Sequence, residues 1–190
     1  MMQQSVMIRR AQHLDAVALA ELQVASWRAT YPGLIPQAVI DGKTVDSRTR
    51  AWRDILTPPD DGSATFVGVL PGRGVIGFIS GGPSKDPLPD TPGQVYGLYL
   101  HPDCLGLGLG RRLMVRMAAY LEDRGEVPIQ VRAVVGNTRA ERAYRSWGAV
   151  PVGVEDFELD GAPLKETVFR FTTTDALVNR AEAIPLRRHD

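Results

Sequence analysis

The residues best placed for chemistry in this chain form a glycine-rich turn that leads into a helix. Gly106, Gly108 and Gly110 alternate with leucines and are followed by Arg111 and Arg112. Glycine has no side chain, so a ligand can come close to the N–H groups of such a turn. The start of a helix also favours negative charge, because its first amides are unpaired and its dipole is positive there. The pattern predicts an anion site, and two arginines in the first helical turn suit a polyphosphate.

Two well-known nucleotide-binding motifs do not fit the glycine turn. A dinucleotide fingerprint that starts at Gly106 needs a third glycine at the position of Arg111. A Walker A motif needs Lys and then Ser or Thr where this chain has Arg112 and Leu113. A nucleotide-dependent oxidoreductase is therefore disfavoured. An anion site and a plain glycine-rich cap of a core helix both stay open.

Strands and helices alternate around this turn. The helix after it is amphipathic, because Leu109, Leu113, Met117 and Leu121 recur at every fourth position, and it runs to about residue 124. Further helices are expected after residue 15, near 37–40, at 45–56, and from 137 or 138 to 148. Strands are expected at 6–9, 65–69, 75–80, 94–100, 129–135, 150–159 and 164–171, and residues 81–93 are expected to form a surface loop. This order predicts a mixed α/β domain.

Composition narrows the class of protein. A chain of 190 residues that is 44% hydrophobic can bury one good core and is too short for two comfortable domains. Its 22 basic and 22 acidic residues balance, so no global charge attracts nucleic acid or an anionic membrane. The single Cys104 excludes an internal disulfide, and the three histidines show no metal-ligand spacing, so no metal is expected. With no apolar run of membrane-helix length and no signal-like start, the sequence predicts a cytoplasmic protein.

Several spaced motifs occur in an order that resembles one known family. Leu98-Tyr99-Leu100-His101-Pro102 precedes the glycine turn, and Asn137, Ala140, Tyr144 and Gly148 follow it. The chain is similar over residues 6–171 to the GCN5-related N-acetyltransferase (GNAT) family. In that family the first motif precedes a glycine loop at the pyrophosphate of acetyl-CoA, and the Asn-Ala-Tyr-Gly series supplies a second cofactor wall.

The resemblance implies a fold and a domain layout. The fold is α/β (mixed α+β), a GNAT fold with a central, mostly antiparallel twisted sheet of about six to seven strands and about four flanking helices. Residues 1–172 are expected to form one N-acetyltransferase domain. Residues 173–190 are expected to be a C-terminal tail, either with a short helix at 176–184 or disordered. Family members are often dimers, so a homodimer stays open, with the tail packed or swapped across its interface.

The resemblance also implies an activity. An acetyl group passes from acetyl-CoA, as co-substrate, to a primary amine by direct attack in a ternary complex, without a metal. The acceptor is a small molecule or a peptide, and antibiotics, polyamines, amino acids and protein amines all stay open. The alternative is a non-catalytic acyl-CoA-binding or regulatory module on the same fold.

Cofactor-binding residues follow from the matched motifs. The backbone of Leu105, Gly106, Leu107, Gly108, Leu109, Gly110 and Arg111 is expected to bind the pyrophosphate. Leu98, Tyr99 and Leu100 are expected to present strand amides to the thioester oxygen, and Asn137 to bind the pantetheine arm. The family usually has Gln or Arg at position 105 and often a basic residue at 107. Because leucine stands at both, Arg111, Arg112 or Arg116 is expected to compensate.

Tyr144 is the expected general acid. The departing thiolate of coenzyme A resembles Cys, with a pKa of about 8.5, and a phenol of pKa about 10 can protonate it within hydrogen-bond reach. Trp27 and Tyr31, in a segment similar to the family's substrate side, are expected to border the acceptor pocket, and Trp52 is a further candidate.

The general base is unassigned. Many relatives carry Glu where this chain has Gln94, and Gln cannot accept a proton usefully. Tyr96, His101 and a chain of water molecules are the alternatives. Cys104 is expected to be a small packing residue, and mixed-disulfide formation with coenzyme A is the other interpretation.

Overall fold

The computed structural model describes residues 5–57, 61–86, 88–175 and 177. Within them, seven strands form one sheet in the order β1-β2-β3-β4-β5-β7-β6, and every neighbouring pair is antiparallel except β4 and β5. The predicted mixed α/β fold with a mostly antiparallel sheet is confirmed. The strands are β1 (Met7–Arg10), β2 (Ala64–Leu70), β3 (Gly74–Pro83), β4 (Gly93–Leu100), β5 (Ile129–Val134), β6 (Val150–Leu159) and β7 (Ala162–Phe171). The α-helices are α1 (Ala16–Thr30), α2 (Gln37–Gly42), α3 (Val45–Ile55), α4 (Leu109–Glu122) and α5 (Thr138–Ser146).

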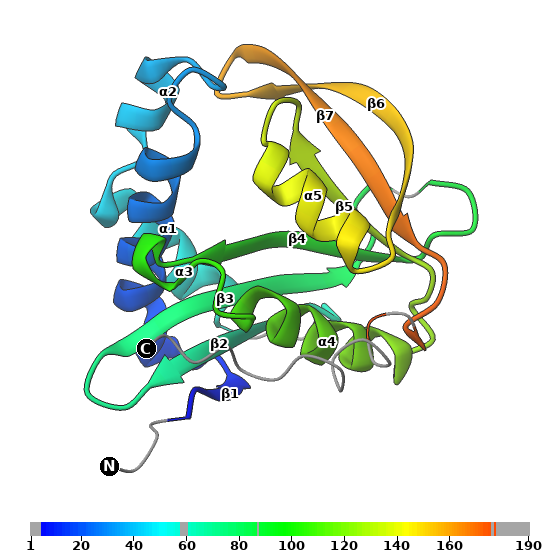
Figure 1. The fold of residues 1–190 in the computed structure, drawn as a ribbon. Coiled ribbons are helices and arrows are strands. Elements are labelled where there is room, and N and C mark those ends of the chain that lie inside the picture. Colours follow the sequence, from blue (N-terminus) through cyan, green and yellow to red (C-terminus); the bar gives the residue numbers. More distant parts are fainter. Residues whose placement is uncertain (1–4, 58–60, 87, 176, 178–190) are drawn as a thin grey trace, which may run out of the picture.

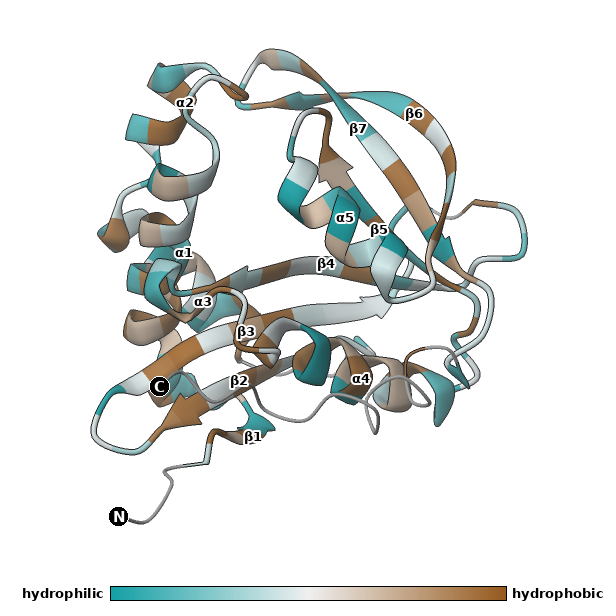
Figure 2. Ribbon diagram, viewed as in Figure 1, coloured by the Kyte–Doolittle hydropathy of each residue, from teal (hydrophilic) through white to brown (hydrophobic). Residues whose placement is uncertain are grey.

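Helices cover both faces of the sheet (Figure 1), because neighbouring strand residues point to opposite sides. On β2 and β3, Phe66 and Ile79 pack with α4, whereas Val67 and Phe78 pack with α1 and α3. Figure 2 shows the matching pattern, with apolar residues along β2, β3 and one side of α4. Layers of apolar side chains therefore pack on both faces of the middle of the sheet and hold β2 and β3 in place beside β4.

β4 and β5 pair over only three residues and then separate. The parallel register runs from Gly93 opposite Ile129 to Val95 opposite Val131, although both strands continue (Figure 1). A register shift lies at the same point, because Gly81 pairs with Val95 and the next pair joins Ser80 to Gly97, leaving one extra residue on β4. Such a bulge bends and twists a strand. The sheet therefore opens between its two central strands.

Local sequence signals predicted the bounds of most helices and strands to within a few residues of those observed. The β6–β7 hairpin turns at Asp160 and Gly161, which both have positive φ as the predicted Asp-Gly turn requires. Asn137 accepts a hydrogen bond from the Ala140 amide and caps α5. The expected loop at 81–93 is shorter than predicted, because β3 extends through Pro83 by pairing with the start of β4.

Two described residues beyond the boundary expected at residue 172, Thr174 and Leu177, pack against the domain. Thr174 is buried and donates to a carboxylate oxygen of Glu122 at 2.8 Å. Leu177 is fully buried in the core beside α4. The helix expected at 176–184 lies almost wholly outside the described residues. None of the described helices combines the length and apolarity needed to cross a bilayer.

Candidate active site

The three glycines of the turn serve two different structural needs. Gly106 and Gly108 have φ of +79° and +77°, and a Cβ at either position would meet no atom within 4 Å. Both positions therefore need glycine for backbone conformation and lie open to a ligand. Gly110 lies inside the first turn of α4, where a Cβ would come within 3.3 Å of Leu100 and 3.4 Å of Trp147. Its missing side chain lets α4 approach β4 and the end of α5.

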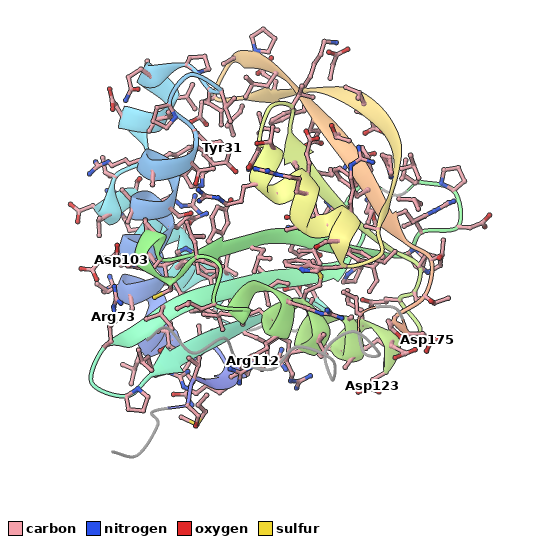
Figure 3. All side chains as sticks on the ribbon, in the orientation of Figure 1. Tyr31, Arg73, Asp103, Arg112, Asp123 and Asp175 are labelled. Atoms are coloured by element: carbon pink, nitrogen blue, oxygen red, sulfur yellow. The ribbon has the colours of Figure 1, made fainter. Side chains whose placement is uncertain are left out.

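The arginines near the turn are held by protein groups. Arg111 is buried and donates to the Leu177 carbonyl at 2.7 Å. Arg112 donates to the Val6 carbonyl at 2.9 Å, and the Arg116 guanidinium lies 4.2 Å from the centre of the Phe66 ring. Figure 3 shows Arg112 on the α4 edge of the molecule. The first amides of α4 have no carbonyl one turn earlier in the helix, so they are the donors that the turn itself offers to an anion.

The end of β4 forms one wall of the opening in the sheet. Leu98 and Leu100 pack against the α4 core, whereas Tyr99 points to the other face and contacts the Phe78 ring at 5.1 Å between centroids. Because the pairing with β5 ends at Val95, the edge of β4 that faces β5 is not joined to a strand beyond that residue, although its other edge stays paired with β3 through Leu100. That edge therefore has peptide groups that sheet pairing does not use.

Tyr144 lies on α5, on the opposite wall. Its ring is buried edge-on against Trp147 and Phe169, with centroids 5.9 and 5.7 Å away. Burial, and then the nearby Tyr99, raise the pKa of the Tyr144 hydroxyl well above its ordinary value. No hydrogen bond to this hydroxyl forms among the residues that the structure describes. The side chain thus keeps its proton at neutral pH, which is the state a general acid needs.

Three tyrosines from distant parts of the chain converge at the opening. Tyr31 ends α1 and packs against Trp27, with ring centroids 5.0 Å apart. Burial, then Tyr99 and Tyr144, raise the pKa of Tyr31, so the three hydroxyl groups are close enough to influence one another. Tyr31 lies on the side of α1 toward α5 (Figure 3). That Tyr31 borders the acceptor pocket stays a prediction.

Gln94, which stands where many relatives have Glu, and the base candidate Tyr96 are both engaged in other contacts. The Gln94 side-chain oxygen accepts from the Lys85 amide at 2.9 Å and anchors the loop before β4. Tyr96 donates to the Pro83 carbonyl at 2.7 Å, and burial, with Asp61 and other anionic groups nearby, raises its pKa to about 12. A Tyr96 hydroxyl held in this way is a poor proton acceptor at neutral pH.

His101 and Cys104 have structural environments. The His101 ring nitrogen Nδ1 accepts from the Asp103 amide at 3.3 Å and caps the short turn after β4. Cys104 is buried in the α4 core, as expected of a packing residue. Burial also limits access to its thiol, which disfavours a mixed disulfide with coenzyme A.

A cleft on the α1 and α3 face leads to β4. Its volume is about 370 Å³, and its lining includes Gly97 and Tyr99 of β4 together with Gln23, Arg48 and Trp52. Trp52 was expected at the acceptor pocket, whereas Gln23 and Arg48 match no motif and were not predicted. The one available signal was spacing: Arg48 and Trp52 lie four residues apart, so they share a face of α3.

Comparison with known proteins agrees with this geometry. Residues 19–149 match the model of the acetyltransferase (GNAT) family. The chain belongs to this family. It is 26% identical over 172 residues to the uncharacterised N-acetyltransferase YuaI of Bacillus subtilis, with 90% of this chain and 96% of that protein covered.

Solved structures show the same fold for this GNAT acetyltransferase. A GCN5-related N-acetyltransferase from Rhodopseudomonas palustris superposes with a TM-score of 0.68 at 22% identity, covering 90% of this chain and 99% of that one. The yncA protein of Salmonella typhimurium, whose structure holds its cofactor acetyl-CoA, has a TM-score of 0.64 at 21% identity, covering 88% and 94%. At these identities the likeness establishes the fold, so the roles of individual residues rest on the geometry above.

Proposed function

We propose that this acetyltransferase moves an acetyl group from acetyl-CoA to a primary amine by direct attack, with both substrates bound at once. The observation that carries the proposal is the opening between β4 and β5. The glycine turn lies at one end of it, the unpaired edge of β4 forms one wall, and Tyr144 lies on the other. The cleft lined by Gly97 and Tyr99 gives a second substrate access from the opposite face.

The residues at the opening suit coenzyme A. A pyrophosphate needs closely approachable donors, and the open left-handed Gly106 and Gly108 followed by the free amides of α4 provide them. Asn137 uses its side-chain oxygen as the α5 cap, so its NH2 group is the donor for the pantetheine arm. A protein of the same fold, yncA, binds acetyl-CoA as its cofactor. Acetyl-CoA would supply the activated acetyl group as a thioester.

The chain's own groups then stabilise charge and move a proton. A fixed N–H at the end of β4, near Leu100, donates to the thioester oxygen as negative charge develops on it. Tyr144 gives its proton to the departing sulfur. Its raised pKa does not prevent this, because a thiolate in the same buried site is also more basic than in water. With Gln94, Tyr96 and His101 held in other contacts, the amine loses its proton to water in the cleft.

Release of the coenzyme A thiol from acetyl-CoA, measured with a panel of primary amines, tests the proposal. The expected result is amine-dependent release, with an N-acetylated product of matching mass. Acetyl-CoA that raises the melting temperature but releases no thiol with any amine would instead indicate a binding module.

A further inference from the structure

A smaller cavity adjoins the cleft on the α1 side. It has a volume of about 210 Å³ and lies between α1, α3 and the end of β6, with Trp27, Lys43 and Leu159 in its lining. We call it the side pocket. Gln23 and Arg48 line both the side pocket and the cleft. The two cavities therefore meet at one arginine.

The guanidinium of Arg48 has three nitrogens, and among the described residues only Nε has a hydrogen-bond partner. Its Nε donates to the Gln23 Oε1 at 3.0 Å, and the Trp52 indole N–H donates to the same oxygen at 3.0 Å. In the part of the chain that the structure describes, no side chain or carbonyl pairs with the two terminal nitrogens of this half-buried guanidinium. A planar fork of N–H groups held in this way matches the two oxygens of a carboxylate.

The Trp27 indole also lines the side pocket. Its Nε1 is buried, and no acceptor for it exists among the described residues. In this arrangement a ligand in the side pocket does not reach that N–H, so an anion there would pair with the terminal nitrogens of Arg48.

Charge in the side pocket favours a monoanion. Lys43 is paired with Asp160 at 2.6 Å, so two positive charges, Arg48 and Lys43, and one negative charge leave a net charge of +1. One carboxylate neutralises this charge, whereas a dianionic phosphate would leave an excess of negative charge. The lining of the cleft includes Asp54, Asp61 and Lys85 besides Arg48 itself, so its charges balance, and its two carboxylates can pair with an ammonium group.

We propose that the acceptor carries a carboxylate as well as its amine, as an α- or ω-amino acid does, and that Arg48 binds the carboxylate in the side pocket. This inference rests on the proposed function and adds the class of acceptor. The amine then lies in the cleft, toward Gly97 and Tyr99 of β4.

The test compares acids with their uncharged analogues. Thiol release is measured with the twenty standard L-amino acids, β-alanine and 4-aminobutyrate, each beside its carboxamide. We expect kcat/KM to be about 10- to 100-fold higher for the preferred acid than for its amide, as for a hydrogen bond to a charged group. Arg48→Met should remove this preference by lowering kcat/KM for the acid alone, with the KM for acetyl-CoA unchanged.

Arg50→Met is the matched control. Arg50 lies on the same helix, is exposed and lines neither cavity, so its replacement should leave the acid preference intact. Arg48→Lys keeps the charge without the planar fork and should retain part of the preference.

Failure of this inference can be distinguished from failure of the proposed function. Equal turnover of acids and amides, or an acid preference that survives Arg48→Met, overturns the carboxylate site while the acetyltransferase activity stands. If no amine releases thiol, the proposed function fails. Calorimetric titration of the same amino acids into the protein saturated with coenzyme A then decides the inference: binding that is lost in Arg48→Met supports it, and no binding, or equal binding by both proteins, refutes it.

Discussion

At the scale of single residues, the buried tyrosine on α5 carries the most specific chemical expectation. Tyr144 is surrounded by Trp147 and Phe169, so its hydroxyl is held in place by packing alone. Replacing Tyr144 with Phe keeps this ring packing and removes the proton. We expect kcat to fall about 10²- to 10⁴-fold, as for loss of a general acid, with the KM for acetyl-CoA changed little. Steady-state kinetics of Tyr144→Phe would measure this.

Tyr120→Phe is the matched control, because that hydroxyl donates to the Gly62 carbonyl away from the opening. It should keep wild-type kcat. Full turnover of Tyr144→Phe, with an unchanged pH profile, would show that another group protonates the sulfur.

The pH dependence follows from the raised pKa values. An acid must be protonated to act, so a pKa raised by burial moves the loss of activity to higher pH than for a free phenol, whose pKa is about 10. We expect kcat/KM to rise with pH as the acceptor amine loses its proton and to show no falling limb below about pH 10. A profile that falls between about pH 7 and 9 would contradict Tyr144 as the acid.

At the scale of elements, the turn before α4 is the proposed pyrophosphate site and also needs glycine for its left-handed backbone, and a second turn separates these two requirements. Gly108 before α4 and Gly72 between β2 and β3 both have φ of +77°, and neither would meet an atom with an added Cβ. Alanine at either position costs about 1–2 kcal/mol through the left-handed conformation. We expect similar losses of unfolding free energy in Gly108→Ala and Gly72→Ala, measured in urea.

Only Gly108→Ala should weaken binding of acetyl-CoA, because only that turn faces the opening. Calorimetric titration of both variants measures the difference. Equal affinity in the two variants would place the pyrophosphate elsewhere. Arg112→Ala in the same titration tests the expected compensation by arginine; its present contact is the Val6 carbonyl.

At the scale of the whole molecule, the described residues Thr174 and Leu177, beyond the boundary expected at residue 172, are buried against the domain. Leu177 has no exposed surface and lies in the core of α4, and Arg111 of the first helical turn donates to its carbonyl. Leu177→Ala should lower the free energy of unfolding by about 2–5 kcal/mol, as for other buried leucines. Leu14→Ala, at a side chain that is 90% exposed, should change it by less than about 0.5 kcal/mol. Equal, small losses of unfolding free energy in both variants would support the domain boundary expected at residue 172.

Features that depend on neighbours in the chain were readable from the sequence alone. The glycine turn, the Asn137 cap, the Asp160-Gly161 hairpin and the apolar spacing of α4 are set by interactions within about four residues. The order of these motifs was sufficient to indicate the GNAT fold and a site at the glycine turn. Tyr144 was predicted as the acid from the same family motif, whose residues from Asn137 onward lie within one helix and its cap.

Tertiary structure decided what depends on pairing between distant segments. The opening between β4 and β5 exists because their register ends at Val95, and no local pattern records a register. Three interactions join elements that are far apart in the sequence: Tyr144 influences Tyr31, Arg111 donates to Leu177, and Arg48 donates to Gln23. The last of these leaves two nitrogens of Arg48 without a partner among the described residues. Such contacts form when non-local apolar surfaces are buried together, so only the folded chain determines which polar groups find partners and which stay available to a ligand.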